Sequence, residues 1–136
     1  MHLVINKELL SKCGGGSDEY WFSYKDYTVK NINQFNTDDK PDDVGQTAYF
    51  VSIGIIPFVS VSNEEIMRNF VKEKGSKKLN NILNDVTSEN FIETFWKNFN
   101  AYPELKDGIE EFAHDYIIGK VQYWCNENNI DFTLDL

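Results

Sequence analysis

The chain has 136 residues, a formal net charge of −9 and an aromatic content of 15%. This length accommodates one hydrophobic core, and the many aromatic residues argue against a disordered chain, so we expect a single α+β domain over residues 1–136. The negative charge is spread evenly along the sequence. Nucleic acid and anionic membranes are therefore excluded as expected partners, and a basic protein is favoured instead.

Two cysteines, Cys13 and Cys125, lie far apart in the sequence and would allow one disulfide. The apolar start at Met1–Ile5 is too short for a secretory signal, and no apolar run approaches the roughly 20 residues of a membrane span. We therefore expect a cytoplasmic protein with two reduced thiols, in which Cys125 is buried and structural.

The first part of the chain predicts a short helix and then a hairpin. Asn6 is suited to cap a helix within residues 3–12, and the glycines at 14–16 fit a flexible turn after it. The strand-forming runs Tyr20–Tyr24 and Tyr27–Ile32 are close enough in sequence to pair as a β-hairpin.

The next segment predicts a loop and a strand. Residues 33–46 are polar and acidic, which indicates a mobile, solvated loop without the spacing and terminal glutamate of a calcium-binding loop. Thr47–Ile56 is the most strand-like run of the chain. Gly54 indicates a bulge or a close contact in it, and Pro57 ends the pairing.

Helices are expected from Ser62 onward. Ser62 and Glu65 fit a capping box, and Gly75 fits the end of that first helix. Four lysines follow around the turn, and we interpret them as a solvated corner: Lys72, Lys74, Lys77 and Lys78. The expected helices are 62–75, 76–86, 88–99 and 103–128, with a closing strand at 130–134.

The long helix at 103–128 is the element around which we expect the fold to be organised. Its apolar residues form two rotated stripes, which predicts that it is packed on two sides. The order of elements predicts an α+β fold with a small, largely antiparallel sheet packed on one face against a bundle of about four helices. The stripes consist of Leu105, Ile109, Phe112 and Tyr116, and of Ile117, Val121 and Trp124.

Candidate catalytic chemistry centres on His114. Glu110 and Glu111 lie one helical turn before this imidazole, so their carboxylates are able to reach the ring and support it as a general base. Glu110, His114 and Asp115 also offer ligands to a divalent metal. A metal site needs further convergent ligands, and the sequence offers no cofactor motif, so we expect no cofactor and interpret His114 as a surface residue.

Candidate binding residues lie in the hairpin and in the acidic loop. Side chains alternate between the two faces of a strand, so the hairpin aromatics are not all expected to point inward, and an exposed aromatic strip would suit a protein partner. The binding residues that we predict are Tyr20, Trp21, Tyr24 and Tyr27 with Asp38, Asp39, Asp42 and Asp43.

A series of short motifs extends over nearly the whole chain. They are the aromatic hairpin, Ile56-Pro57, the helix at 67–71, Phe95-Trp96, Tyr102-Pro103-Glu104-Leu105 with Phe112, and Trp124-Cys125. In this order they resemble the uncharacterised protein family numbered 0158, which is bacterial. That family has no established activity, so the resemblance has implications for the fold rather than for a reaction.

Two function hypotheses follow. The first is a non-enzymatic interaction module that binds or inhibits a basic protein, such as a toxin or a nucleic-acid enzyme. It rests on negative charge and surplus aromatics without a catalytic set. The alternative is a small metal-dependent hydrolase, or another enzyme, centred on His114.

Overall fold

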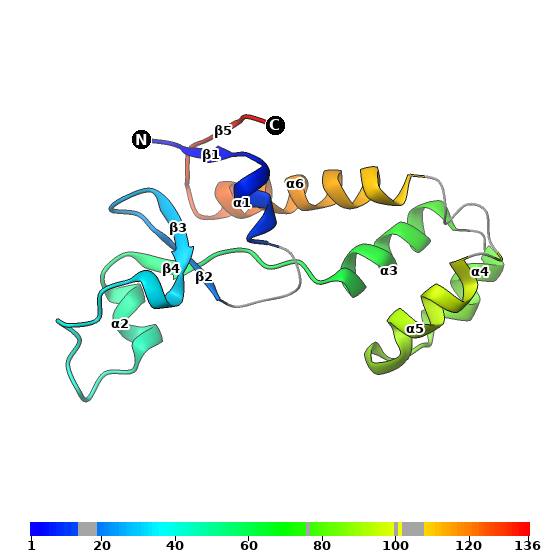
Figure 1. The fold of residues 1–136 in the computed structure, drawn as a ribbon, viewed down its shortest axis with the longest axis horizontal. Coiled ribbons are helices and arrows are strands. Elements are labelled where there is room, and N and C mark those ends of the chain that lie inside the picture. The colour runs from blue at the N-terminus through cyan, green and yellow to red at the C-terminus, as the bar shows by residue number, and fades with distance from the viewer. Residues whose placement is uncertain (14–18, 76, 100, 102–107) are drawn as a thin grey trace.

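The computed structural model describes residues 1–13, 19–75, 77–99, 101 and 108–136. Their elements form two lobes that α6 connects (Figure 1). The sheet lobe comprises the described residues within 1–61 and 117–136, and the helical lobe comprises those within 62–116. In chain order the elements are β1 Leu3–Ile5, α1 Lys7–Ser11, β2 Tyr20–Ser23, β3 Thr28–Asn31, the 3-10 helix η1 Ile32–Gln34, α2 Gln46–Ser52, β4 Ile55–Pro57, α3 Asn63–Lys74, α4 Lys77–Asn84, α5 Ser88–Phe99, α6 Ile109–Glu127 and β5 Phe132–Leu134.

The predicted α+β class and the hairpin are confirmed. Strands β2 and β3 pair antiparallel, and β4 adds to the other edge of β2 to give the order β3-β2-β4. The expectation that helices cover one face of this sheet is wrong, because both faces are covered. Phe22 joins a core with α1 and α6, whereas its neighbour Trp21 packs with Phe50 of α2.

The strand predicted at Thr47–Ile56 is wrong over most of its length. Residues 46–52 form α2, and only Ile55–Pro57 pair with β2. Phe50 is fully buried against Trp21, while Val51 is 56% exposed, so the packing of one helical side overrides the strand propensity of the run. Gly54 has φ +82, a left-handed conformation in which glycine is favoured, and it redirects the chain into β4.

The helix predicted over residues 3–12 begins later than expected. Residues 3–5 form β1, and Asn6 then caps α1 by accepting a hydrogen bond from the Leu9 amide at 2.9 Å. Strand β1 pairs with β5 in parallel, in the register Leu3↔Phe132. The predicted closing strand is therefore present as β5. It pairs with β1, whose residues 3–5 the sequence predicts to be helical.

The helices α3, α4 and α5 of the helical lobe begin and end close to the residues that the sequence predicts. Ser62 accepts a hydrogen bond from the Glu65 amide at 3.1 Å, and Gly75 ends α3. The lobe has its own core of α3, α4 and α5 side chains: Phe70, Val71, Leu79, Leu83, Phe91 and Phe95. Trp96 is 50% exposed, and its ring makes a T-shaped contact with the buried Phe95 ring from outside this core.

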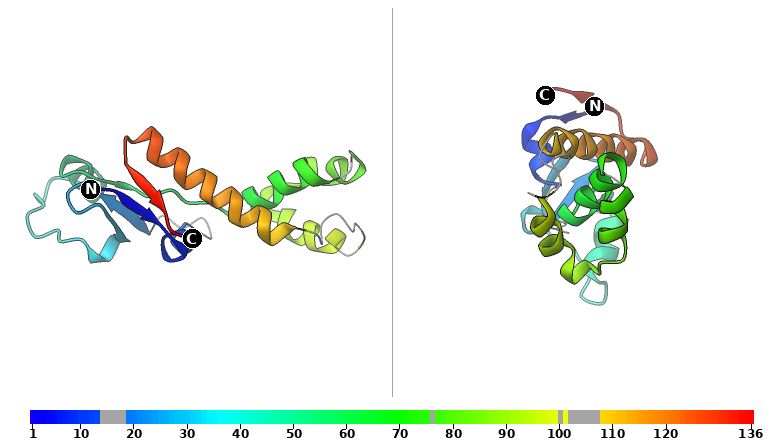
Figure 2. Two further views of the ribbon diagram at one scale, coloured as in Figure 1. Left: turned by 90° about the horizontal axis from the view of Figure 1, so that it is seen from above. Right: turned by 90° about the vertical axis from the view of Figure 1, so that its right-hand side faces the viewer.

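Helix α6 serves two cores rather than one. Figure 2 shows this helix running from one lobe into the other. Ile109 and Phe112 pack on the core of the helical lobe, whereas Val121 and Cys125 are buried in the sheet lobe. The apolar stripe in the first half of α6 therefore packs on the helical lobe, and the stripe in its second half packs on the sheet lobe. The predicted start at Pro103, together with Leu105, lies outside the described residues. Helix α6 ends at Glu127, close to the predicted end at residue 128, and Asn129 follows in the left-handed conformation with φ +55.

None of the described helices combines the length and the apolar character that a membrane span requires.

Candidate functional site

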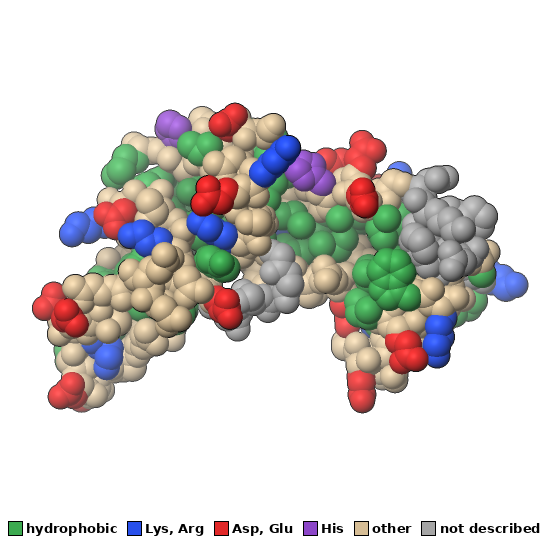
Figure 3. Space-filling model, viewed as in Figure 1, with side chains coloured by type: hydrophobic (Ala, Val, Ile, Leu, Met, Phe, Trp, Pro, Cys, Tyr) green, Lys and Arg blue, Asp and Glu red, His purple; other side chains and the backbone are tan. Residues whose placement is uncertain are grey.

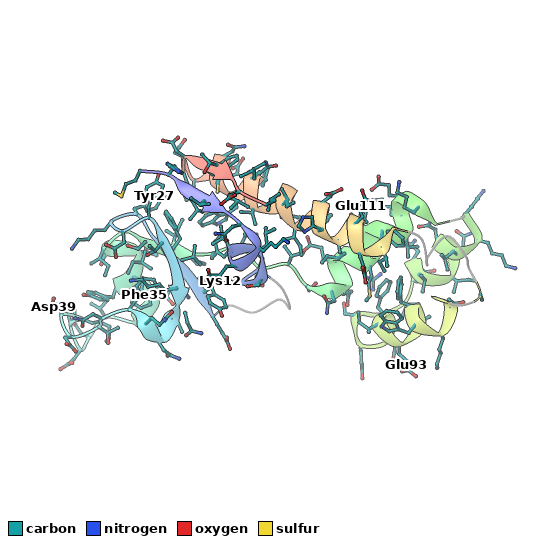
Figure 4. The ribbon with its side chains drawn as sticks, turned by 45° about the horizontal axis from the view of Figure 1, so that its top comes forward. Lys12, Tyr27, Phe35, Asp39, Glu93 and Glu111 are labelled. Atoms are coloured by element: carbon teal, nitrogen blue, oxygen red, sulfur yellow. The ribbon has the colours of Figure 1, made fainter. Side chains whose placement is uncertain are left out.

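The acidic loop before α2 forms one end of the molecule, where acidic side chains gather at the lower left of Figure 3. Asp38, Asp39, Asp42 and Asp43 are all exposed, and Figure 4 shows Asp39 at the outer end of this loop. These four carboxylates lie within six residues, so their fields add at one tip.

Local hydrogen bonds hold the loop in a defined conformation. The Asn36 side chain accepts from the Asp38 amide at 2.7 Å, and the Lys40 amide donates to Thr37 O. The Lys40 ammonium donates to the carbonyl oxygens of Pro41 at 3.2 Å and of Val44 at 2.8 Å. The positive charge in the loop is therefore engaged by backbone rather than by a carboxylate.

The hairpin aromatics do not form the exposed aromatic strip that strand alternation predicts. Trp21 is 6% exposed and lies against Phe50 at a ring distance of 5.4 Å. Tyr20, Tyr24 and Tyr27 are half-buried against the core of the sheet lobe. The Tyr24 hydroxyl donates to Asn128 O at 2.8 Å, and burial raises the pKa of Tyr24. Because α2 and α6 cover opposite faces of the hairpin, the aromatic side chains of both faces pack inside the protein.

His114 is exposed on α6, as are Glu110 and Glu111. Among the residues that the structure describes, no group of three His, Cys, Asp or Glu side chains is arranged to hold a metal ion. The surface placement of His114 is thus confirmed, and an enzymatic role for it stays a prediction.

The two cysteines are free and fully buried in the same core. Burial, with a smaller contribution from the charge of Cys125, raises the pKa of Cys13 to about 12. Burial raises the pKa of Cys125 to about 11. Neither thiol is a good nucleophile at neutral pH, because the thiolate is the reactive form. The structural role expected for Cys125 agrees with this environment.

A polar network between α3 and α6 was not foreseen from the sequence. The Tyr116 hydroxyl donates to Glu65 Oε2 at 2.6 Å and accepts from Asn69 Nδ2 at 3.2 Å. Lys120 Nζ lies 3.1 Å from the same Glu65 oxygen. The spacing of Tyr116 and Lys120 on one helix face was visible in the sequence. Their partners on α3 are far away in the chain, and no local pattern indicates them.

Comparison of the chain with family models, with curated proteins and with solved structures finds no match. The resemblance to the family numbered 0158 therefore stays a prediction.

Proposed function

We propose that this protein is a non-enzymatic interaction module of the cytoplasm that binds a basic protein through its acidic loop. The observation that carries the proposal is the exposure of all four loop aspartates, in a loop whose outer end is marked by Asp39 (Figure 4). Clustered exposed charge of one sign attracts an oppositely charged partner and accelerates its association.

The internal order of the loop supports the same proposal. Binding a flexible segment loses free energy to ordering, and the turns at Asn36 and Lys40 reduce that loss. The lysine offsets only one of the four carboxylates, and its ammonium is held by two backbone carbonyls, so the loop keeps a net negative charge. A basic surface, such as that of a nucleic-acid enzyme, has the complementary charge.

The test is a comparison of two variants with the same change in net charge. In the first, Asp38, Asp39, Asp42 and Asp43 are all replaced by Asn. In the second, four exposed acids elsewhere are neutralised by amides: Glu73, Glu110, Asp131 and Asp135. Each protein is used to capture partners from an extract of the native host at low and moderate salt.

We expect a basic protein to bind the wild type and the second variant, and to be lost from the loop variant. Its binding should weaken with salt, since exposed charges are screened. Equal losses from both variants would show that net charge alone is responsible. Capture of no basic protein by the wild type would contradict the proposal directly.

A further inference from the structure

A cavity of about 460 Å³ opens in the helical lobe between α3, α4 and α5. These helices and the acidic loop before α2 lie at opposite ends of the molecule (Figure 1). This volume lies in the usual range for small-molecule sites. Its floor is apolar and consists of Val71, Leu83 and Phe91, which are 3%, 2% and 1% exposed. Its walls are polar, so a ligand would meet packed hydrocarbon below and hydrogen-bonding groups around its edge.

Four asparagines contribute amide groups to these walls, one from α3 and three from α4. Asn81 and Asn84 are exposed, and Asn80 is anchored by donating to Val71 O at 3.1 Å. An amide offers both donors and an acceptor, so such a wall suits a polar ligand rather than a hydrocarbon.

Arg68 forms a rigid part of the cavity. Its guanidinium lies 4.1 Å from the centre of the Phe91 ring, and it donates to Glu64 Oε2 at 3.0 Å and to Val86 O at 2.6 Å. Three contacts from different elements fix one orientation, so ligand binding would not need to order this side chain.

The local charge is positive although the protein is acidic. The described lining residues include Arg68 and Lys72 and no carboxylate. Glu64 pairs with Arg68, which leaves Lys72 as the unpaired charge of the lining, and in the adjoining segment 73–85 the exposed Lys74, Lys77 and Lys78 outnumber the exposed Glu73 and Asp85. At physiological ionic strength charges are screened beyond about 8 Å, so the nearby lysines outweigh the distant acidic loop.

We propose that this cavity binds a small organic or inorganic oxyanion, with its charged group at Lys72 and its hydrogen-bonding groups at Asn81 and Asn84. The four lysines at this turn, which the sequence predicts to form a solvated corner, therefore differ in position. Lys72 lines the cavity, and Lys78 does not. The proposal does not rest on the acidic loop or on a protein partner.

The experiment is an NMR titration of the full-length, isotope-labelled protein with three probes: inorganic phosphate, citrate and adenosine 5′-monophosphate. We expect at least one probe to shift the amide signals of residues 68–72 and 80–84 at submillimolar concentration. Phosphate alone would indicate a phosphate group, citrate alone a carboxylate, and preference for the nucleotide a ligand that uses the whole cavity.

Two lysine variants provide the matched comparison, because both residues are exposed in the same corner. Lys72→Gln should weaken binding about tenfold, as expected for loss of one charge-assisted contact, and Lys78→Gln should leave it nearly unchanged. Asn84→Leu should also weaken it, while circular dichroism shows that each variant is folded. No shift at these residues up to millimolar probe, or equal losses for the two lysine variants, would overturn the proposal.

Discussion

The Tyr116 hydroxyl on α6 and the Glu65 carboxylate on α3 share a hydrogen bond of 2.6 Å, which joins two helices that are far apart in sequence. Removing the hydroxyl leaves Glu65 with Lys120 alone. We expect Tyr116→Phe to lower the free energy of unfolding by about 1 kcal/mol, since hydrogen bonds to charged groups are stronger than neutral ones. Urea unfolding measures the effect. Tyr123→Phe is the control, because Tyr123 is 64% exposed, and an equal loss there would contradict the assignment.

The same network makes stability depend on pH. Partial burial acts to raise the pKa of Glu65, but hydrogen bonds from Tyr116 and Lys120, together with the charge of Lys120, outweigh it and lower that pKa. A carboxyl whose pKa is lowered on folding stabilises the protein above its unfolded value of about 4.5, and this contribution disappears as the pH falls through the lowered pKa.

We therefore expect the wild type to lose more stability than Glu65→Gln when the pH is lowered from about 6 to about 3. The measurement is the urea midpoint of both proteins across this range. Parallel curves would show that Glu65 does not contribute to the acid sensitivity.

Two glycines should respond in opposite ways to alanine. A Cβ on Gly75 would lie 2.6 Å from the carbonyl oxygen of Val71, so Gly75→Ala should lower the free energy of unfolding by about 1–3 kcal/mol. A Cβ on Gly119, within α6, would meet nothing within 4 Å, so Gly119→Ala should raise stability by about 0.5–1 kcal/mol through helix propensity. Thermal melts compare the two, and a stabilising Gly75→Ala would contradict the predicted clash.

The buried thiols should be protected from modification. With pKa values of about 12 for Cys13 and about 11 for Cys125, few molecules carry a thiolate at about pH 8, and neither sulfur is accessible. We expect a thiol reagent such as dithionitrobenzoate to react slowly with the native protein and quickly in urea. Rapid reaction of either cysteine in native buffer would show that the core of the sheet lobe opens readily.

The two lobes should unfold together, as the predicted single domain over residues 1–136 requires. Helix α6 contributes to both cores, and a 19-residue helix is marginal in water without tertiary packing. In Trp96→Phe the remaining tryptophans, Trp21 and Trp124, report only on the sheet lobe. Their fluorescence transition should coincide with the helix signal in circular dichroism. Separate transitions would indicate two domains.

The sequence predicted elements that depend on neighbours in the chain. The Ser62 cap, the stop at Gly75 and the hairpin around Tyr27 rest on short-range hydrogen bonds and turn preferences, and all are present. The left-handed residue after α6 also follows from a local rule, because asparagine tolerates that conformation.

The errors arose where distant residues decide the structure. Residues 46–52 have strand-forming side chains, yet Trp21 offers a surface that a helix covers better, with Phe50 directed inward. The pattern at Leu3 and Ile5 fits a strand only once Phe132 is known to lie beside it. The network at Tyr116 and the cavity beside Lys72 depend on how helices meet, which periodicity does not specify.

The parallel pairing of β1 with β5 has a consequence for the order of assembly. The ribosome produces β1 long before β5, so Leu3 and Ile5 lack their partner strand while the elements between the two strands are made. Contacts between such remote segments also form slowly, because a very long loop must close. The β1 edge that β5 covers in the folded protein is thus unpaired during this interval, and this is the stage at which a chaperone would be most useful.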